Sequence, residues 1–171
     1  MILSVSELKE FITTNKSDKE LELELLALES SIRKYTNNNF QNVYIRYEVD
    51  ILNNKILLSS PYLKVGDTIQ ISNSRFNSGV YVIKDINEGL DLGCVLYDEN
   101  KILITKIEYS NDIKLGAIEM LRWKFENAEK INIASETISR HSISYKNDFD
   151  TKLNFPKEVI SFLNKYVKPR F

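Results

Sequence analysis

The sequence predicts an α+β fold, in which a helical core of about four helices carries an inserted small antiparallel β-barrel or sheet. Three observations lead to this prediction. Apolar residues recur at helical spacing in residues 1–40 and again in residues 112–171. Residues 41–111 instead alternate in short β-branched and aromatic runs. The length of 171 residues and the hydrophobic fraction of 43% suit one compact domain with a sizeable insert.

An N-terminal helical hairpin is expected in residues 1–40. Each of its two helices opens with a capping box, in which a serine precedes a glutamate by three positions. The pairs are Ser4 with Glu7 and Ser17 with Glu20. The second helix then carries a heptad-like stripe of apolar residues, and the polar segment TNNNF ends it.

An inserted β-subdomain is expected in residues 41–111. Six short runs there are rich in β-branched and aromatic residues, and turn-forming pairs such as Asn53-Asn54 separate them. The runs are VYIRYEV, KILL, TIQIS, GVYVIKDI, LGCVLY and ILITKIEY. They predict a small barrel or a strongly twisted antiparallel sheet. Cys94 lies in the fifth run, which predicts a small buried residue and not a reactive thiol.

Residues 112–171 are expected to form two further helices joined by an extended arm. Asp112 is predicted to cap the third helix, which is apolar around most of its circumference. Pro156 is predicted to begin the fourth helix and Pro169 to end it. Residues 134–149 alternate polar and apolar side chains without a glycine, which indicates the arm. We expect these helices and the N-terminal hairpin to pack as one core.

The only histidine, His141, stands among serines, which raises the question of a hydrolase. A hydrolase nucleophile usually sits on a glycine-flanked turn, and triad members normally converge from separate segments. Residues 134–149 have neither feature, so Ile138, Ile143 and Tyr145 are interpreted as anchors of the arm. A hydrolase that uses His141 stays an alternative, but no catalytic residue is predicted.

No cofactor or metal site is predicted either. One histidine and one cysteine are too few ligands for a nitrogen- or sulfur-based metal site. The glycine motifs that cradle nucleotide phosphates are absent from the sequence. A weak alternative is a small-barrel nucleic-acid-binding module, in which Tyr44, Arg46 and Tyr47 would contact the nucleic acid. The β-block has an excess of acidic residues, which disfavours this alternative.

The net charge of −1 provides no overall positive field for nucleic acid or anionic membranes. The charge is unevenly distributed, however. Residues 112–171 carry 11 basic and 8 acidic side chains, whereas residues 1–111 carry 12 and 16. Such asymmetry suits a molecule that meets other copies or other proteins end to end. No signal peptide and no apolar run of about 20 residues is found, so we expect a soluble protein of a reducing cytoplasm, or of a particle assembled there.

Several motifs follow one another along nearly the whole chain. SELKEFI precedes ALESSIRKYTNNNF, in which Tyr35 and Thr36 are followed by a polar turn and Phe40. Then come VGDTIQISNSRFNSGVYVI, a helix with Trp123, IASETISRHSISY and FPKEVISFLNKYVKPRF. In this order the motifs resemble the head-to-tail connector (adaptor) proteins of long-tailed phages and prophages, which bind beneath the portal. The later motifs resemble a longer Gram-positive prophage branch, and the β-block departs from the smallest, nearly all-helical members.

The resemblance implies a structural virion protein and not an enzyme. About twelve copies would form a ring that extends the portal DNA channel and docks the tail. Its partners would be other copies, the portal protein, a tail-completion or tail-terminator protein, and passing double-stranded DNA without sequence-specific binding. No membrane is involved. The location would be the virion neck at the head-tail junction, and the host cytoplasm during assembly.

Two segments are expected to contact a neighbouring subunit or the portal. The first is the arm, and the second is the tail NKYVKPRF, which has no acidic residue after Glu158. Pro169 cannot continue a helix, so Arg170 and Phe171 are expected to leave it extended and to reach outward. The tail is expected to dock on an acidic groove of the portal or of an adjacent subunit. The predicted contact residues are Ile138, Arg140, His141, Ile143, Tyr145, Lys165, Tyr166, Lys168, Arg170 and Phe171.

Overall fold

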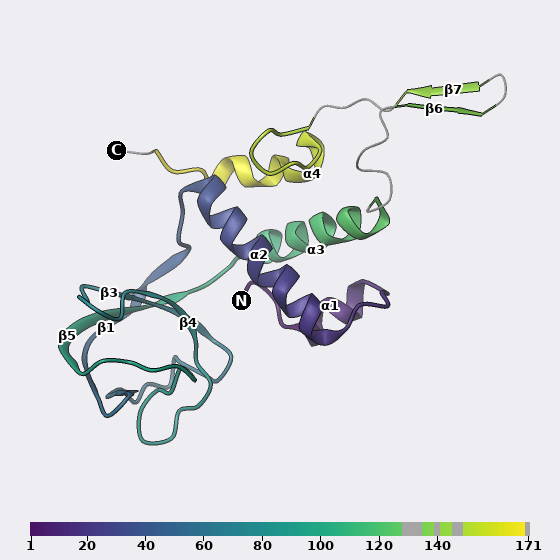
Figure 1. Ribbon diagram of the computed structural model, residues 1–171. Coiled ribbons are helices and arrows are strands. Elements are labelled where there is room, and N and C mark those ends of the chain that lie inside the picture. Colours follow the sequence, from purple (N-terminus) through teal and green to yellow (C-terminus); the bar gives the residue numbers. More distant parts are fainter. Residues whose placement is uncertain (128–134, 139–140, 145–148, 170–171) are drawn as a thin grey trace. The chain divides into compact units, whose positions relative to one another are not determined.

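A computed structural model describes residues 1–127, 135–138, 141–144 and 149–169 (Figure 1). The chain divides into two compact units. The β unit consists of Met1 and Asn39–Tyr109, and the helical unit consists of Ile2–Asn38 and the described residues from Ser110 onward. No helix of the described residues is long and apolar enough to cross a membrane.

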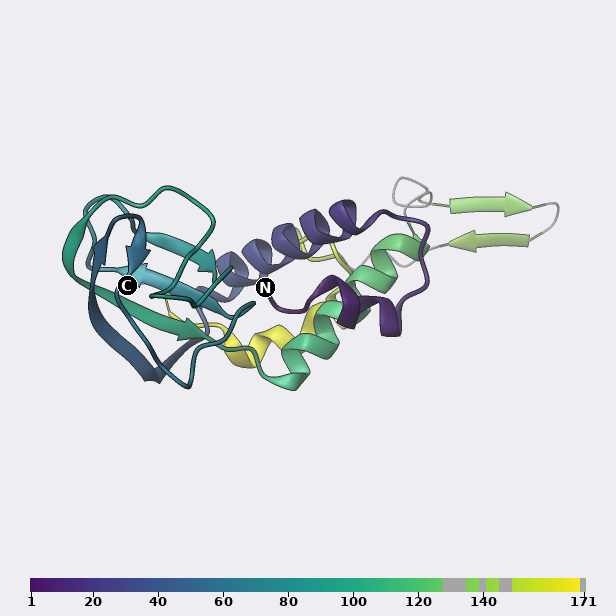
Figure 2. The ribbon, with the colours of Figure 1, turned by 90° about the horizontal axis from the view of Figure 1, so that it is seen from below.

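The helical unit is built from elements at both ends of the sequence. They are α1 (Val5–Phe11), α2 (Asp18–Thr36), α3 (Asn111–Glu126), α4 (Lys157–Ile160) and the 3₁₀ helix η1 (Ser161–Tyr166). Both predicted capping boxes are confirmed. In each box the serine hydroxyl accepts a hydrogen bond from the backbone N–H of the glutamate, and the glutamate carboxylate accepts one from the backbone N–H of the serine. The pairs are Ser4 with Glu7 and Ser17 with Glu20. The elements α4 and η1 lie alongside α3 (Figures 1 and 2).

Two predictions about helix ends differ from the structure. The N-cap of α3 is Ser110 and not Asp112, which lies in the first turn. The carboxylate of Asp112 is occupied by partners from the C-terminal segment, described below. The predicted fourth helix is a single α-helical turn followed by η1. A 3₁₀ helix is tighter than an α-helix, so the side chains of this segment are distributed differently from the predicted 3.6-residue period.

The β unit contains a five-stranded antiparallel sheet that curves into an open half-barrel. Its strands are β1 (Gln41–Leu52), β2 (Lys55–Ile56), β3 (Thr68–Ser72), β4 (Gly79–Val82) and β5 (Glu99–Ile107), in the order β2-β1-β5-β3-β4. Asn53 and Asn54 connect β1 to β2 with φ angles of 51° and 67°. Asparagine tolerates this left-handed conformation, which two-residue hairpin turns require.

The fifth predicted run, LGCVLY, does not form a strand. Leu92 and Leu96 nevertheless point into the β-unit core, so the apolar character of the run reflects burial without strand pairing. Cys94 lies between them and is exposed, and the prediction of a buried cysteine is therefore wrong.

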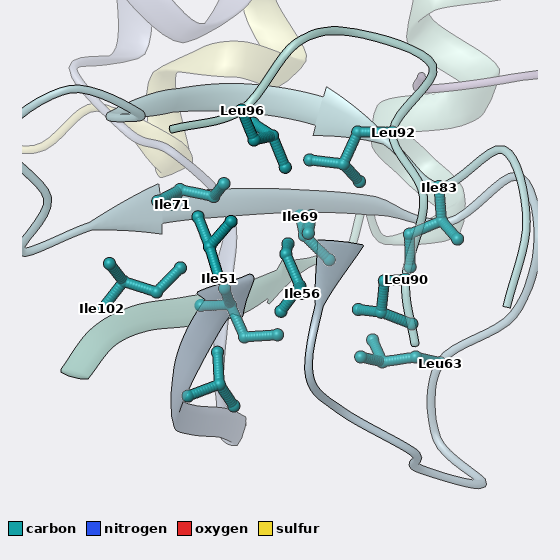
Figure 3. Close-up of a cluster of buried hydrophobic side chains, with 12 residues drawn as sticks. Ile51, Ile56, Leu63, Ile69, Ile71, Ile83, Leu90, Leu92, Leu96 and Ile102 are labelled. Atoms are coloured by element: carbon teal, nitrogen blue, oxygen red, sulfur yellow. The ribbon is translucent and has the colours of Figure 1, made fainter. Parts of the chain in front are cut away.

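The sheet encloses a hydrophobic core of its own. Figure 3 shows side chains from the strands and from the following loops pointing toward one another. The buried members are Val49, Ile51, Ile56, Leu63, Ile69, Ile71, Ile83, Leu90, Leu92, Leu96, Ile102 and Ile104. Burial of this many aliphatic side chains supplies the main stabilisation of the β unit.

The prediction of a helical core that carries an accessory β insert is therefore wrong. The chain is a mixed α+β protein, but its strands are about as extensive as its helices, and the helices are not its core. The physical reason is that the sheet buries one face against its own loops and closes a separate apolar cluster.

The predicted arm contains two short strands, β6 (Ser135–Ile138) and β7 (His141–Ser144), which pair antiparallel as a hairpin. His141 is paired with Ile138, and Ile143 is paired with Glu136. Arg140 and Tyr145 lie outside the described residues. The predicted contact of the arm with a neighbouring subunit stays a prediction.

Candidate interaction groove

The helical unit contains a groove between α3 and the consecutive elements α4 and η1. Its volume is about 560 Å³. The apolar part of the lining comes from Leu115, Trp123, Val159 and Phe162. Leu115 is 56% exposed, so the groove offers apolar surface to solvent. We call this feature the α3 groove.

The floor of the α3 groove depends on the absence of a side chain at Gly116. A Cβ atom built at this position would lie 2.2 Å from Cζ of Phe162. The Phe162 ring of η1 therefore lies directly on the backbone of α3. Glycine in the middle of a helix is unfavourable, so its presence in α3 was the sequence signal for this close approach.

Carboxylates line the rim of the α3 groove. Asp112, Glu119 and Glu126 recur every seven residues along α3, and α4 adds Glu158. A seven-residue step is about two helical turns, or about 10 Å, so the three α3 carboxylates form one stripe. Arg122, the basic residue in the lining, pairs with Glu119. The rim therefore attracts cations.

Trp123 lines the far end of the α3 groove and packs against two phenylalanine rings outside the groove. The ring centroid of Trp123 lies 5.6 Å from that of Phe149 and 5.4 Å from that of Phe155. The first pair is edge-to-face and the second is tilted, and such arrangements are typical of stabilising aromatic pairs. Trp123 therefore has a fixed environment at one end of the groove.

The opposite end is occupied by the C-terminal segment of the same chain. The Lys165 ammonium lies 2.5 Å from a carboxylate oxygen of Asp112. The Tyr166 hydroxyl lies 2.7 and 2.8 Å from the two Asp112 oxygens and 2.8 Å from the Ser110 hydroxyl. The hydrogen bond from Lys165 is the main cause that holds the pKa of Asp112 well below its ordinary value, and the bonds from Ser110 and Tyr166 act in the same direction.

The segment after Tyr166 is bound to the end of α2. The Lys168 N–H donates to the Thr36 carbonyl at 2.8 Å. The Asn37 side-chain amide donates to the Pro169 carbonyl at 2.9 Å. Lys168 and Pro169 are therefore bound through their backbone within the helical unit, and the predicted docking of the tail on another protein stays a prediction. Arg170 and Phe171 lie outside the described residues.

The structure thus brings together only some of the predicted contact residues. Lys165 and Tyr166 meet at Asp112, a partner that the sequence interpretation missed. The two residues are 53 and 54 positions from Asp112, so no local pattern could have indicated the cluster. Gly116 and the carboxylate stripe were also missed, although the seven-residue spacing was visible in the sequence.

The residues proposed for nucleic-acid binding are mostly engaged within the β unit. Arg46 donates to the Thr105 hydroxyl at 3.1 Å, and the Tyr47 hydroxyl lies 2.8 Å from that of Ser60. Only Tyr44, which is 94% exposed, offers its ring to solvent. One stacking side chain without an adjacent available cation is a poor platform for nucleic acid. Within the described ranges, no cluster of three or more metal-ligating side chains is found.

The Asp112 cluster leads to a prediction about pH. Replacing Asp112 with asparagine is expected to lower the free energy of unfolding by about 1 kcal/mol at neutral pH, because the ion pair and the charged hydrogen bonds are lost. The folded-state pKa of Asp112 is depressed, so its stabilisation is present above the unfolded-state value of about 3.9 and is lost as the pH falls through the folded-state value.

Urea unfolding of both proteins at pH 7 and pH 3 checks this prediction. The stability difference between wild type and Asp112→Asn is expected to shrink at the lower pH. Asp18→Asn is a matched control, because Asp18 also lies in the first turn of a helix but has a more exposed ion pair. A difference that stays constant over this pH range would contradict the prediction.

Comparison with known proteins does not assign the chain to a family. No protein-family model matches the sequence, and no curated protein matches it significantly.

Proposed function

We propose that this protein is a structural head-to-tail connector of a tailed phage or prophage. In this role it would assemble as a ring beneath the portal, extend the DNA channel and dock the tail. The observation that carries the proposal is the α3 groove, an open apolar surface with a rim of carboxylates. The motif order described above supports the same function.

A ring of identical subunits needs two different, complementary surfaces on each copy. One surface of a subunit binds the other surface of the next subunit, and the pattern closes into a cycle. The α3 groove supplies one surface with an excess of negative charge. Residues 112–171 as a whole are net basic, so they also supply positive charge for a complementary surface.

The chemistry of the α3 groove favours binding over catalysis. No histidine or cysteine is among the described residues that line it. Its one hydroxyl, on Ser161, donates to the Glu158 carbonyl at 2.9 Å. This hydrogen bond joins the hydroxyl to a backbone carbonyl and not to a base that could activate it as a nucleophile. The proposed role is therefore structural.

The location of the protein in tailed particles tests this function. Antibodies against the purified chain, visualised with gold on tailed particles, are expected to label the head-tail junction. Particles from a strain that lacks the gene are expected to be tailless heads, and the gene supplied in trans should restore tails. Absence of the protein from purified particles would overturn the proposal. A salt-dependent shift of DNA by the purified chain would favour the nucleic-acid-binding alternative.

A further inference from the structure

We propose that the α3 groove binds the last residues, 168–171, of a second copy of this chain. The groove residue Trp123 and the rim carboxylates would come from one copy, and Lys168, Arg170 and Phe171 from the other. This inference deepens the proposed function, on which it rests, by naming a contact between adjacent subunits.

The first argument is that a lysine of the C-terminal segment already binds the carboxylate stripe. Lys165 pairs with Asp112, the first carboxylate of the stripe, within the same chain. The stripe continues along α3 to Glu126, and Glu158 faces the same groove from α4. Within residues 1–127 and 149–169, neither Glu126 nor Glu158 has an ion-pair partner at salt-bridge distance. The stripe therefore has capacity for further cations.

The second argument is charge complementarity. After Glu158 the sequence contains three basic residues and no acidic one. Lys165 is used within its own chain, and the sequence of the segment contains two further cationic residues, Lys168 and Arg170. A guanidinium group binds carboxylates through two parallel hydrogen bonds, so Arg170 suits the rim of the groove.

The third argument concerns size and apolar character. The groove volume of about 560 Å³ lies within the usual range for sites that enclose a ligand, about 300–1,000 Å³. Leu115, Trp123 and Val159 provide an apolar wall for one large side chain, and Phe171 is the large apolar residue of the segment. Aromatic residues and arginine are the side chains that most often dominate binding energy at interfaces.

The chain's own tail cannot supply this occupant. Asn37 holds Pro169 at the end of α2. The two residues that follow span at most about 7 Å. Asp112 binds Lys165 at one end of the groove, whereas Glu126 lies 14 residues further along α3, or about 21 Å away. We therefore assign the occupant of the distal groove to another copy.

Trp123 provides the test, because it is the only tryptophan of the chain and lines the groove. A synthetic peptide of residues 164–171 is titrated into the purified full-length protein while tryptophan fluorescence is recorded. We expect a saturable change that weakens as salt is added. The control peptide carries Arg170→Glu and Phe171→Ala, and it is expected to produce no saturable change.

Variants of the protein locate the peptide. The double variant Glu126→Lys and Glu158→Lys is expected to bind the peptide at least about tenfold more weakly. Glu10→Lys is the matched control, because Glu10 is an exposed residue of α1 that does not line the groove. Its affinity is expected to equal that of wild type. Circular dichroism confirms that each variant is folded.

The inference is overturned if the tryptophan fluorescence of the wild-type protein does not respond to millimolar peptide. It is also overturned if the control peptide binds as tightly as the wild-type peptide, or if the double variant binds the wild-type peptide as tightly as the wild-type protein does. Such a failure leaves gold labelling of the head-tail junction unaffected, so the inference can fail while the proposed function stands. Conversely, peptide binding without labelling of particles would retain the contact between copies and reject the connector function.

Discussion

Replacing Ile69 with alanine is expected to lower the free energy of unfolding of the β unit by about 2–5 kcal/mol. Ile69 is fully buried as the second residue of β3, where it pairs with Tyr81 of β4 and Lys106 of β5. β3 is hydrogen-bonded to a strand on each side, so its backbone resists collapse into the space. The lost burial and the cavity both contribute to the cost.

Amide hydrogen exchange is the appropriate measurement, because Trp123 belongs to the helical unit and its fluorescence does not report directly on the sheet. Faster exchange is expected throughout β1, β3 and β5. Val95→Ala is the control, because Val95 is in the same unit and is 81% exposed. Its effect is expected to stay within about 0.5 kcal/mol. Similar exchange in the two variants would mean that the apolar cluster is not the main stabilisation of this unit.

Replacing Gly116 with alanine is expected to lower the free energy of unfolding by about 1–3 kcal/mol. In an ordinary helix this change is stabilising by about 1 kcal/mol, because alanine has the higher helix propensity. At this position the added Cβ would overlap the Phe162 ring, so the ring must leave the floor of the α3 groove. A gain in the free energy of unfolding would indicate that helix propensity dominates, and a loss would indicate that the clash with Phe162 dominates.

A double-mutant cycle isolates the contact between the two residues. In the Phe162→Ala background the ring is absent, and Gly116→Ala is expected to become neutral or stabilising. Thermal unfolding of the four proteins measures the coupling, and tryptophan fluorescence reports any change at Trp123, which lines the same groove. A Gly116→Ala variant that is more stable than wild type in both backgrounds would show that Phe162 does not lie against α3.

The starts of α1 and α2 and most strands could be predicted because their causes are local. A serine hydroxyl that caps the residue three positions later needs no distant partner, and both capping boxes are confirmed. The run TIQIS coincides with β3, because alternating β-branched residues favour an extended backbone wherever a partner strand is present. The class of mixed helices and strands follows from the same local preferences.

The candidate groove was decided only in the tertiary structure. Asp112 is a residue type that often caps helices, but here its carboxylate binds Lys165 and Tyr166, which lie more than 50 positions later in the sequence. The run LGCVLY has the composition of a strand, but it pairs with no strand of the sheet, and its leucines are buried from a loop. Local composition cannot show which partner a side chain will meet.

By itself, the sequence determined where the first two helices begin, where most strands lie and how charge is distributed along the chain. Only the tertiary structure decided that the sheet closes its own apolar core and that the Phe162 ring lies on Gly116 beside a stripe of carboxylates. The physical reason is that local preferences act over a few neighbouring residues. Cores and grooves form instead where helix and sheet faces that are tens of residues apart in the sequence pack together. The free energy of this packing depends on the shapes of the side chains as well as on their composition.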